Sequence, residues 1–157
     1  MKIGTCVVFT DMDSMPKKLK ALQDNGFDTC QLLCWEPKLW NDDNAETLKG
    51  LLAEYGVVPS AFWCGWEGPG VWDFYDGQLT LGLVPPEYRT MRVKNLCDGA
   101  DFAKQLGITD VITHMGFIRR IPMIRSLPRS VWRCAQSLST CRRTASICCL
   151  KPVRRRR

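Results

Sequence analysis

The stretch Ile108-Thr-Asp-Val-Ile-Thr-His-Met-Gly-Phe-Ile118 decides the fold that we expect for this chain. Its run of apolar and β-branched residues is typical of a parallel strand that is buried on both faces. A helical pattern ends at Gly107, just before it, and the stretch carries the only histidine of the chain, His114. We therefore expect a strand over residues 109–117 with a functional histidine at its carboxyl end, where Gly116 would let a ligand approach the backbone.

The residues before this stretch repeat the alternation of strand and helix. Strands are expected over residues 2–9, 27–35 and 57–66, and helices over residues 17–24, 44–55 and 87–106. Ser14 is the expected cap of the first helix, and a glycine follows each helix. This alternation predicts parallel strands joined by right-handed crossovers, as in open doubly wound sheets and in β/α barrels. No G-x-G-x-x-G follows the first strand, so a dinucleotide-binding sheet is not supported.

The charges of the chain divide at residue 118. Residues 1–118 hold all 16 acidic residues and 10 of the 22 basic ones, whereas residues 119–157 hold the other 12 basic residues and no acid. A chain of 157 residues can form one domain with a core, but a complete eight-stranded barrel usually needs about 250 residues. We therefore expect an ordered α/β part over residues 1–118 and a basic, disordered tail over residues 119–157.

The nine cysteines are not expected to form disulfides. Five of them fall in or beside predicted strands and a helix, where cysteine acts as a small buried apolar residue; these are Cys6, Cys30, Cys34, Cys64 and Cys97. The chain begins with a predicted strand instead of a signal peptide, and no apolar run approaches the roughly 18 residues of a membrane span. A cytoplasmic protein with reduced thiols and no membrane partner is therefore expected.

The carboxyl ends of the strands are where the site of a β/α barrel lies. In this chain those four ends read Thr10-Asp11, Trp35-Glu36, Trp66-Glu67 and His114-Met115-Gly116. Tryptophan faces suit the apolar side of a sugar ring, and carboxylates suit its hydroxyls or a metal ion. The simpler alternative is that the tryptophans pack under loops and that the glutamates are solvated. A long aromatic loop over residues 67–87 is also expected to be functional.

Three segments resemble the sugar phosphate isomerase/epimerase family, the xylose-isomerase-like TIM barrels. They are GFDTCQLLCWEPKLW (26–40), SAFWCGWEGPGVWDFYDGQLTLGLVPPEYR (60–89) and GADFAKQLGITDVITHMGFI (99–118). The resemblance covers about residues 1–118, the first four β/α units. It implies an α/β fold in the form of a partial (β/α)8 TIM barrel, a half barrel, followed by a basic tail that is foreign to the family.

The resemblance also implies an activity. The intact family members move a proton next to a carbonyl of a sugar or sugar phosphate through an enediolate, with two glutamates and a divalent metal (Mn, Mg, Co or Zn). By analogy, five residues would line the sugar pocket, and His114 would also face the metal; these are Trp35, Glu36, Trp66, Glu67 and His114. The glutamates and most metal ligands of the family come from strands five to eight. We therefore expect no intact catalytic set, no tight metal binding and no activity in this chain. The alternative is a sugar-binding α/β module without chemistry.

The resemblance ends after Ile118, where the chain continues RRIPMIRSLPRSVWRCAQSLSTCRRTASICCLKPVRRRR. One hypothesis is a shifted reading frame. Codons exist for residues 119–125 that read PENPYDP in the neighbouring frame, and codons for residues 141–157 that read MPANGQYLLFETGQETP. In that frame a metal-binding glutamate is spelled across the codons of Leu150 and Lys151. The alternative is a true basic tail that attracts polyanions, without specific nucleic-acid recognition. Self-association through the open barrel edges is expected in either case.

Overall fold

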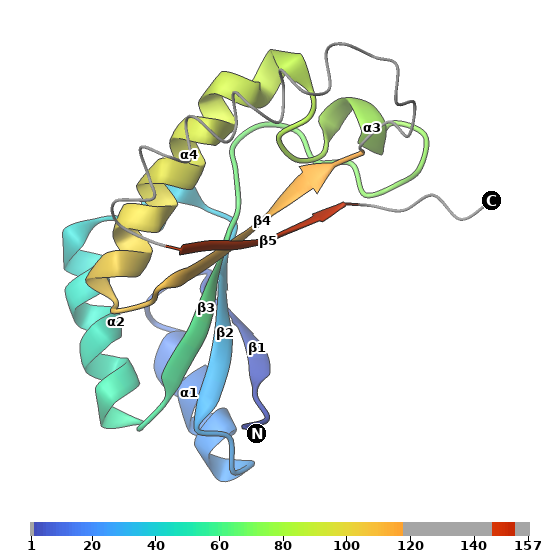
Figure 1. Ribbon diagram of the computed structural model, residues 1–157. Helices are drawn as coiled ribbons and strands as arrows, with labels where there is room; N and C mark the ends of the chain where they lie inside the picture. Colours follow the sequence, from blue (N-terminus) through green and yellow to red (C-terminus); the bar gives the residue numbers. More distant parts are fainter. Residues whose placement is uncertain (1, 118–145, 153–157) are drawn as a thin grey trace.

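The computed structural model describes residues 2–117 and 146–152, and Figure 1 shows its elements. In chain order they are β1 (Thr5–Val8), α1 (Met15–Asp24), β2 (Thr29–Cys34), the 3-10 turn η1 (Pro37–Leu39), α2 (Asp42–Glu54), β3 (Val58–Cys64), α3 (Gly77–Thr80), α4 (Pro86–Gln105), β4 (Asp110–Gly116) and β5 (Ser146–Pro152). The strands form one sheet in the order β1-β2-β3-β4-β5, and all neighbours are parallel. This confirms the predicted α/β fold of successive β/α units.

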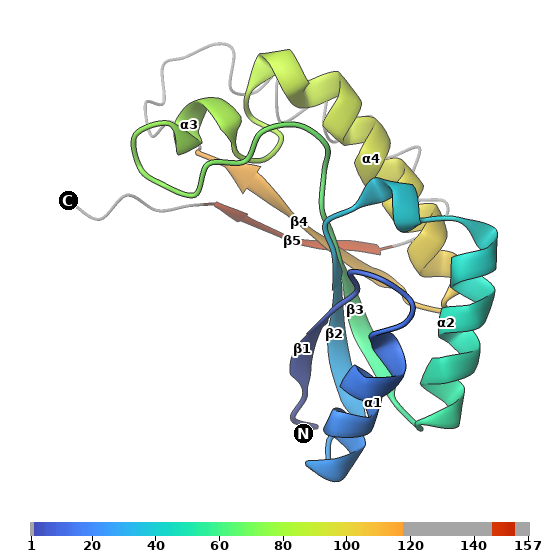
Figure 2. The same cartoon turned by 180° about the vertical axis from the view of Figure 1, so that it is seen from behind.

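Helices α1, α2 and α4 cover one face of the sheet, as both ribbon views show (Figures 1 and 2). The strand residues alternate between this face and the opposite one, because successive side chains of a strand point to opposite sides. In β2, for example, Cys30, Leu32 and Cys34 are buried towards the helices, whereas Gln31 and Leu33 are half-buried on the other side. We call that other side the inner face, since it would face the axis of a closed barrel.

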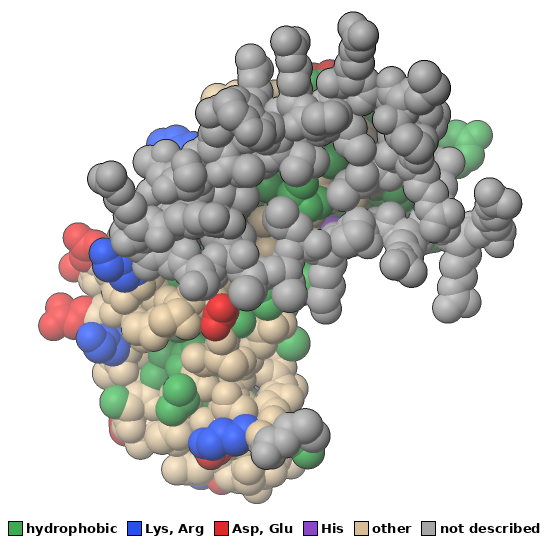
Figure 3. All heavy atoms as spheres, in the orientation of Figure 1, with side chains coloured by type: hydrophobic (Ala, Val, Ile, Leu, Met, Phe, Trp, Pro, Cys, Tyr) green, Lys and Arg blue, Asp and Glu red, His purple; other side chains and the backbone are tan. Residues whose placement is uncertain are grey.

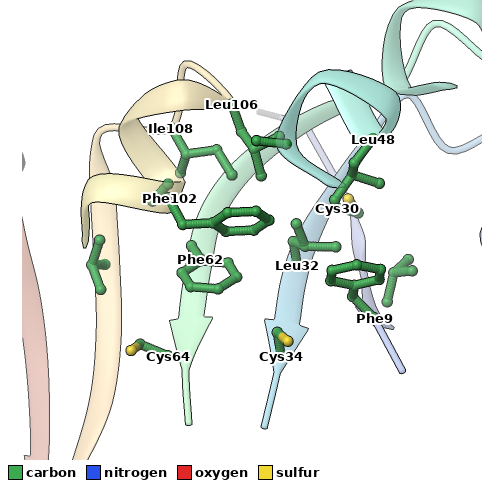
Figure 4. Packing of buried hydrophobic residues seen from close by; sticks show 14 of the residues in the cluster. Phe9, Cys30, Leu32, Cys34, Leu48, Phe62, Cys64, Phe102, Leu106 and Ile108 are labelled. Carbon is green, nitrogen blue, oxygen red and sulfur yellow. The ribbon is translucent and has the colours of Figure 1, made fainter. Parts of the chain in front are cut away.

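The core lies between the sheet and the helices (Figure 4). Three phenylalanines form its centre. The Phe9 ring stacks on Phe102 with 6.4 Å between centroids, and Phe62 lies 5.6 Å from Phe102. Phe102 comes from α4, so these contacts fix that helix against the residue that follows β1 and against the carboxyl half of β3. Each fully buried ring of this kind stabilises the fold by about 1.5–3 kcal/mol.

The structure confirms each predicted strand and helix of residues 1–118 and corrects two details. Ser14 precedes α1, but its side chain makes no capping hydrogen bond. Instead, the Asp11 carboxylate accepts a hydrogen bond from the Ser14 backbone N–H at 2.7 Å. Cys6 is exposed, in contrast to the buried position expected for it, because it lies on the inner face, opposite the helices that cover Val7.

β5 lies in the segment that the sequence assigns to a disordered tail. Residues 146–152 pair in parallel with β4 and so continue the sheet by one strand, a difference from the expectation. The run Ile147-Cys-Cys-Leu150 is apolar, as is usual for a strand in a parallel sheet. The predicted tail residues 119–145 and 153–157 lie outside the described part of the chain. Among the described helices, none is long and apolar enough to span a membrane.

Candidate functional site

Trp35, Trp66 and His114 lie together at the carboxyl ends of three neighbouring strands. Trp35 directly follows β2, Trp66 follows β3 by two residues, and His114 lies near the end of β4. The two indole rings meet edge to face with 5.4 Å between centroids, and the His114 ring lies 6.4 Å from Trp66. The structure therefore brings these three predicted residues together at one edge of the sheet.

Two further tryptophans complete what we call the aromatic cluster: Trp35, Trp63, Trp66, Trp72 and His114. Trp63 is an inner-face residue of β3 and lies 5.8 Å from His114. Trp72 comes from the loop after β3, and its ring meets His114 edge to face at 4.9 Å and Trp35 at 5.9 Å. Figure 3 shows hydrophobic side chains, in green, where the grey atoms leave this face of the molecule visible. His114 is thus surrounded by indole rings from β3 and from the loop that follows it.

Gly65 allows the ends of β2 and β3 to approach each other. Its backbone N–H donates a hydrogen bond to the Cys34 carbonyl at 2.9 Å. A Cβ atom at this position would lie 2.5 Å from the Trp35 Cα, closer than real Cβ atoms come to other atoms. The glycine between Cys64 and Trp66 therefore brings the Trp66 ring within reach of Trp35.

The loop that carries Trp72 is seated on the end of β4. The backbone N–H groups of Leu83 and Val84 both donate to the Met115 carbonyl, at 2.9 and 3.0 Å. A Cβ at Gly116, whose φ is +90°, would lie 2.1 Å from the Leu81 carbonyl oxygen. The expectation that this glycine leaves room for a ligand is therefore corrected, because the chain's own loop occupies that room.

Arg92 lies under the same loop, with 1% of its surface exposed. It donates hydrogen bonds to the backbone carbonyls of Glu67 (3.3 Å), Pro69 (2.6 Å), Thr80 (2.6 Å) and Gly82 (2.7 Å). Burial of the guanidinium lowers the pKa of Arg92 from its usual value. Sequence reasoning missed this residue, although an arginine among the buried positions of an amphipathic helix is an available signal.

The two glutamates lie at the rim, outside the aromatic contacts. Glu36 is exposed, and its carboxylate forms an ion pair with Lys38 at 3.0 Å. Glu67 is exposed as well, and its backbone is held by the Asn95 side chain, which accepts a hydrogen bond from the Glu67 N–H at 3.1 Å. Asp11 at the end of β1 is bonded to Thr10 and Ser14, which lowers its pKa. The carboxylates are therefore available to solvent instead of forming part of the cluster.

The described residues do not supply a metal-binding set. In residues 2–117 and 146–152, no three or more His, Cys, Asp or Glu side chains are placed to hold one ion. The rings that surround His114 are carbon-rich, whereas Mg²⁺ and Mn²⁺ prefer oxygen ligands. The divalent metal implied by the resemblance therefore does not fit the described residues alone.

A hollow lies at the opposite, amino ends of the strands. Its lining residues come from β1, β2, β3 and the segment just before β1: Lys2, Gly4, Thr5, Cys6, Thr29, Gln31 and Ser60. Catalytic sites of β/α barrels lie at the other end of the strands. We therefore assign the candidate site to the aromatic cluster and not to this hollow.

Comparison with known proteins shows the fold. No protein-family model and no curated protein matches the chain. Among solved structures, a xylose isomerase domain protein from Planctomyces limnophilus is similar with a TM-score of 0.74 and 21% identity over 92% of this chain and 51% of that one. The D-allulose 3-epimerase from Methylomonas sp. is similar with a TM-score of 0.59 and 14% identity over 93% of this chain and 50% of that one.

The same fold occurs in a protein with another function and in a protein with bound metal. Endonuclease IV from Thermus thermophilus is similar with a TM-score of 0.58 and 18% identity, over 90% of this chain and 47% of that one. A xylose isomerase-like TIM barrel protein from Mycobacterium smegmatis, in complex with magnesium, has a TM-score of 0.55 and 16% identity, over 84% and 45%. The chain spans about half the length of these proteins. It therefore has the fold of about half of a xylose isomerase-like TIM barrel.

Proposed function

We propose that this chain carries the sugar-binding wall of a metal-dependent sugar or sugar phosphate isomerase or epimerase. The observation that supports this most directly is the aromatic cluster at the carboxyl ends of β2, β3 and β4. Similarity to sugar epimerases supports the reaction class. The comparable similarity to an endonuclease means that the fold alone does not decide it.

Trp72 is the ring best placed to contact a sugar. It packs on His114 and Trp35, yet 59% of its surface is exposed. Only 8% of the surface of Trp66 is exposed, and this ring supports the rings of Trp72 and Trp35 from the buried side of the cluster. The face of an indole carries negative charge density, which attracts the polarised C–H groups on the apolar side of a sugar ring. Trp72 and Trp35 therefore form the contact surface, and Trp66 holds it in place.

The polar residues of the site have separate roles in this proposal. Glu36 and Glu67 follow the two strand-end tryptophans and would accept hydrogen bonds from sugar hydroxyls. His114 would donate or accept a hydrogen bond from within the aromatic cluster, as imidazole can do either near neutral pH. The metal and the two proton-transferring glutamates would come from the second half of the barrel. We therefore infer that this chain binds sugar without catalysing its isomerisation.

Titration with sugars, followed by tryptophan fluorescence, tests the proposal. A ketose, its aldose isomer and the corresponding phosphates are compared, each with and without Mn²⁺. We expect a saturable change that Trp72→Ala weakens by about tenfold, since one aromatic contact contributes on the order of 1 kcal/mol or more. Tyr75→Ala is the matched control, because Tyr75 lies in the same loop, is 86% exposed and stands outside the cluster.

The outcomes separate the alternatives. No saturation with any of these sugars would refute the sugar-binding wall. Sugar binding that needs no metal would show that the aromatic cluster binds sugar without the second half of a barrel. It would also favour the alternative of a sugar-binding α/β module without chemistry. Turnover of a ketose by the purified chain with Mn²⁺ would refute the inferred lack of activity.

A further inference from the structure

The four carbonyls that Arg92 binds belong to two separate segments of the loop. Glu67 and Pro69 lie where the chain leaves β3, and Thr80 and Gly82 lie where it returns towards α4. One guanidinium therefore joins the beginning and the end of residues 67–82. We call this segment the clamped loop; it carries Trp72 between its two ends.

Arg92 also contacts the aromatic cluster directly. Its guanidinium carbon lies 5.2 Å from the centroid of the Trp66 ring and 4.7 Å from that of Tyr88. Such cation–π contacts contribute to the placement of both rings. Arg92 thus connects the supporting tryptophan, both segments of the clamped loop and α4.

The arrangement requires an arginine and not merely a positive charge. No carboxylate forms an ion pair with Arg92 in the described part of the chain, so the buried charge is stabilised by carbonyl dipoles. The planar guanidinium presents several N–H groups in a fixed fork, which can reach carbonyls on two segments at once. A lysine ammonium is a compact point donor and cannot span both. Arg89, by comparison, binds only the returning segment, at the carbonyls of Leu83 and Val84.

We propose that Arg92 is a positioning residue that closes the clamped loop and thereby holds Trp72 against His114. For sugar binding this rests on the proposed function, but the placement of Trp72 does not. Without the guanidinium, the buried carbonyl of Gly82 and three part-buried carbonyls would lose their donor, and the two segments would separate. Trp72 would then leave the cluster even though α4 and β3 remain folded.

Chemical rescue of the Arg92→Ala variant of the full chain tests this proposal. The readout is quenching of Trp72 fluorescence by acrylamide, obtained as the difference between each protein and the same protein with Trp72→Phe. We expect Trp72 to become more accessible to acrylamide in Arg92→Ala. Millimolar guanidinium chloride, far below denaturing concentration, should reverse the change by filling the vacated site. The same concentration of sodium chloride should not.

Lys94→Ala is the matched control. Lys94 lies on the same helix, is exposed and pairs with Asp98, so its removal should leave Trp72 quenching unchanged. If Arg92→Ala loses the far-UV circular dichroism of the folded chain, the quenching is measured on Arg92→Lys instead. It keeps the charge but not the fork, and we expect Trp72 to be exposed in it as well. Unchanged quenching in Arg92→Lys would overturn the proposal, as would a folded Arg92→Ala whose exposed Trp72 does not respond to guanidinium.

Sugar binding gives an independent second readout. If the unmodified chain binds a sugar, Arg92→Ala should weaken binding on the order of tenfold, and guanidinium should restore it. If the unmodified chain binds no sugar, the proposed function fails. The quenching comparison then still decides the role of Arg92, because it requires no ligand.

Discussion

Asp73 holds the tip of the clamped loop through one carboxylate oxygen. Its Oδ1 accepts hydrogen bonds from the backbone N–H groups of Tyr75 (2.8 Å), Asp76 (2.7 Å) and Gly77 (3.3 Å). These bonds favour the ionised form and lower the pKa of Asp73 below 3.8. The contribution of these hydrogen bonds to the stability of the folded state is therefore present above pH 3.8. It is lost as the pH falls through the lower pKa of the folded state.

We accordingly predict that the Asp73 carboxyl titrates below pH 3.8 in the folded chain. The amide shifts of Tyr75 and Asp76, followed by NMR against pH, should report this midpoint. In Asp73→Asn the same amides should lose that transition, because the amide side chain does not ionise. A midpoint at or above 3.8 would show that the carboxylate does not hold the loop tip in solution.

Cysteines on the two faces of the sheet should react with an alkylating reagent at different rates. Burial raises the pKa of Cys30 to about 11, whereas Cys6 is exposed on the inner face. Since the thiolate is the reacting form, we predict rapid alkylation of Cys6 and slow alkylation of Cys30 at mildly alkaline pH. Peptide mass mapping should measure each site, and Cys6→Ser should remove only the Cys6 signal. Equal rates at both sites in the folded chain would contradict the packing.

The same raised pKa has a consequence for stability. The folded state favours the neutral form of the Cys30 thiol. The stabilisation that this thiol gives the folded state is therefore complete below the unfolded pKa of 9.0, and it is lost as the pH rises towards about 11. The pH dependence of unfolding should therefore steepen in this alkaline range, and Cys30→Ala should flatten it. A profile that Cys30→Ala leaves unchanged would mean that the thiol is not buried in solution.

The sequence identified those residues of the aromatic cluster that stand at the ends of predicted strands, because the backbone of the strands determines their position. Trp35, Trp66 and His114 stand at the ends of parallel strands, and such ends meet at one edge of a sheet. Trp72 was not identified as a site residue because its place depends on how the clamped loop folds back, which no local pattern shows. The place of Arg92 among the buried positions of α4 was a local signal, but its role was missed because its partners are carbonyls of that loop.

At the scale of elements, α4 is fixed on the sheet by a contact that leaves no room for a side chain. A Cβ at Gly99 would lie 2.4 Å from the Cys64 Sγ and 3.3 Å from the Trp40 ring. We predict that Gly99→Ala lowers the free energy of unfolding by about 1–3 kcal/mol through overpacking. Gly50→Ala is the control, because a Cβ there meets nothing within 4 Å on the exposed side of α2.

Urea denaturation measures both variants. Gly50→Ala should raise the free energy of unfolding by about 0.5–1 kcal/mol, since alanine restricts the unfolded chain and favours the helix. Opposite signs for the two glycines are the expected result. If Gly99→Ala were as stable as the unmodified chain, α4 would not pack on β3 as described.

The long elements were predictable because their signals are local. Apolar runs bounded by turns indicated the four strands of residues 1–118, and apolar residues at helical spacing indicated α1, α2 and α4. The turn η1 and the helix α3 were missed; they span three and four residues, too few for a periodic pattern. β5 was missed because its apolar run stands among arginines, a composition that is typical of disorder.

At the scale of the whole molecule, an open half barrel leaves a strand edge and an inner face without the partners of a closed barrel. β1 pairs only with β2 among the described strands, and Val8 on its inner face is 37% exposed. We predict concentration-dependent self-association, measurable by sedimentation velocity. Val8→Lys should weaken it, because charges on edge strands oppose pairing. Leu79→Lys, at an exposed position on α3, should not.

The register of β5 sharpens the reading-frame hypothesis. β5 pairs with β4 so that position 150 lies opposite Thr113 and position 151 opposite His114. Under this hypothesis, the codons of Leu150 and Lys151 would together spell, in the neighbouring frame, the glutamate that ends the family's fifth strand. A glutamate at position 151 would therefore stand beside His114, the residue that the family resemblance places at the metal. If the hypothesis holds, the frame that gives family-like text would also place a carboxylate next to the histidine.

We therefore predict that the gene, read one nucleotide earlier after the codon of Ile118, encodes an acidic continuation with a glutamate at position 151. The gene sequence itself is the first measurement. A repaired chain in that frame should then gain Mn²⁺ binding, detectable by calorimetry, which the present chain should lack. Changing the restored glutamate to glutamine should remove much of that binding, since a carboxylate ligand is replaced by a neutral amide. A neighbouring frame that is rich in stop codons or lacks this glutamate would refute the hypothesis, and the Arg-rich segment would then stand as a true basic tail.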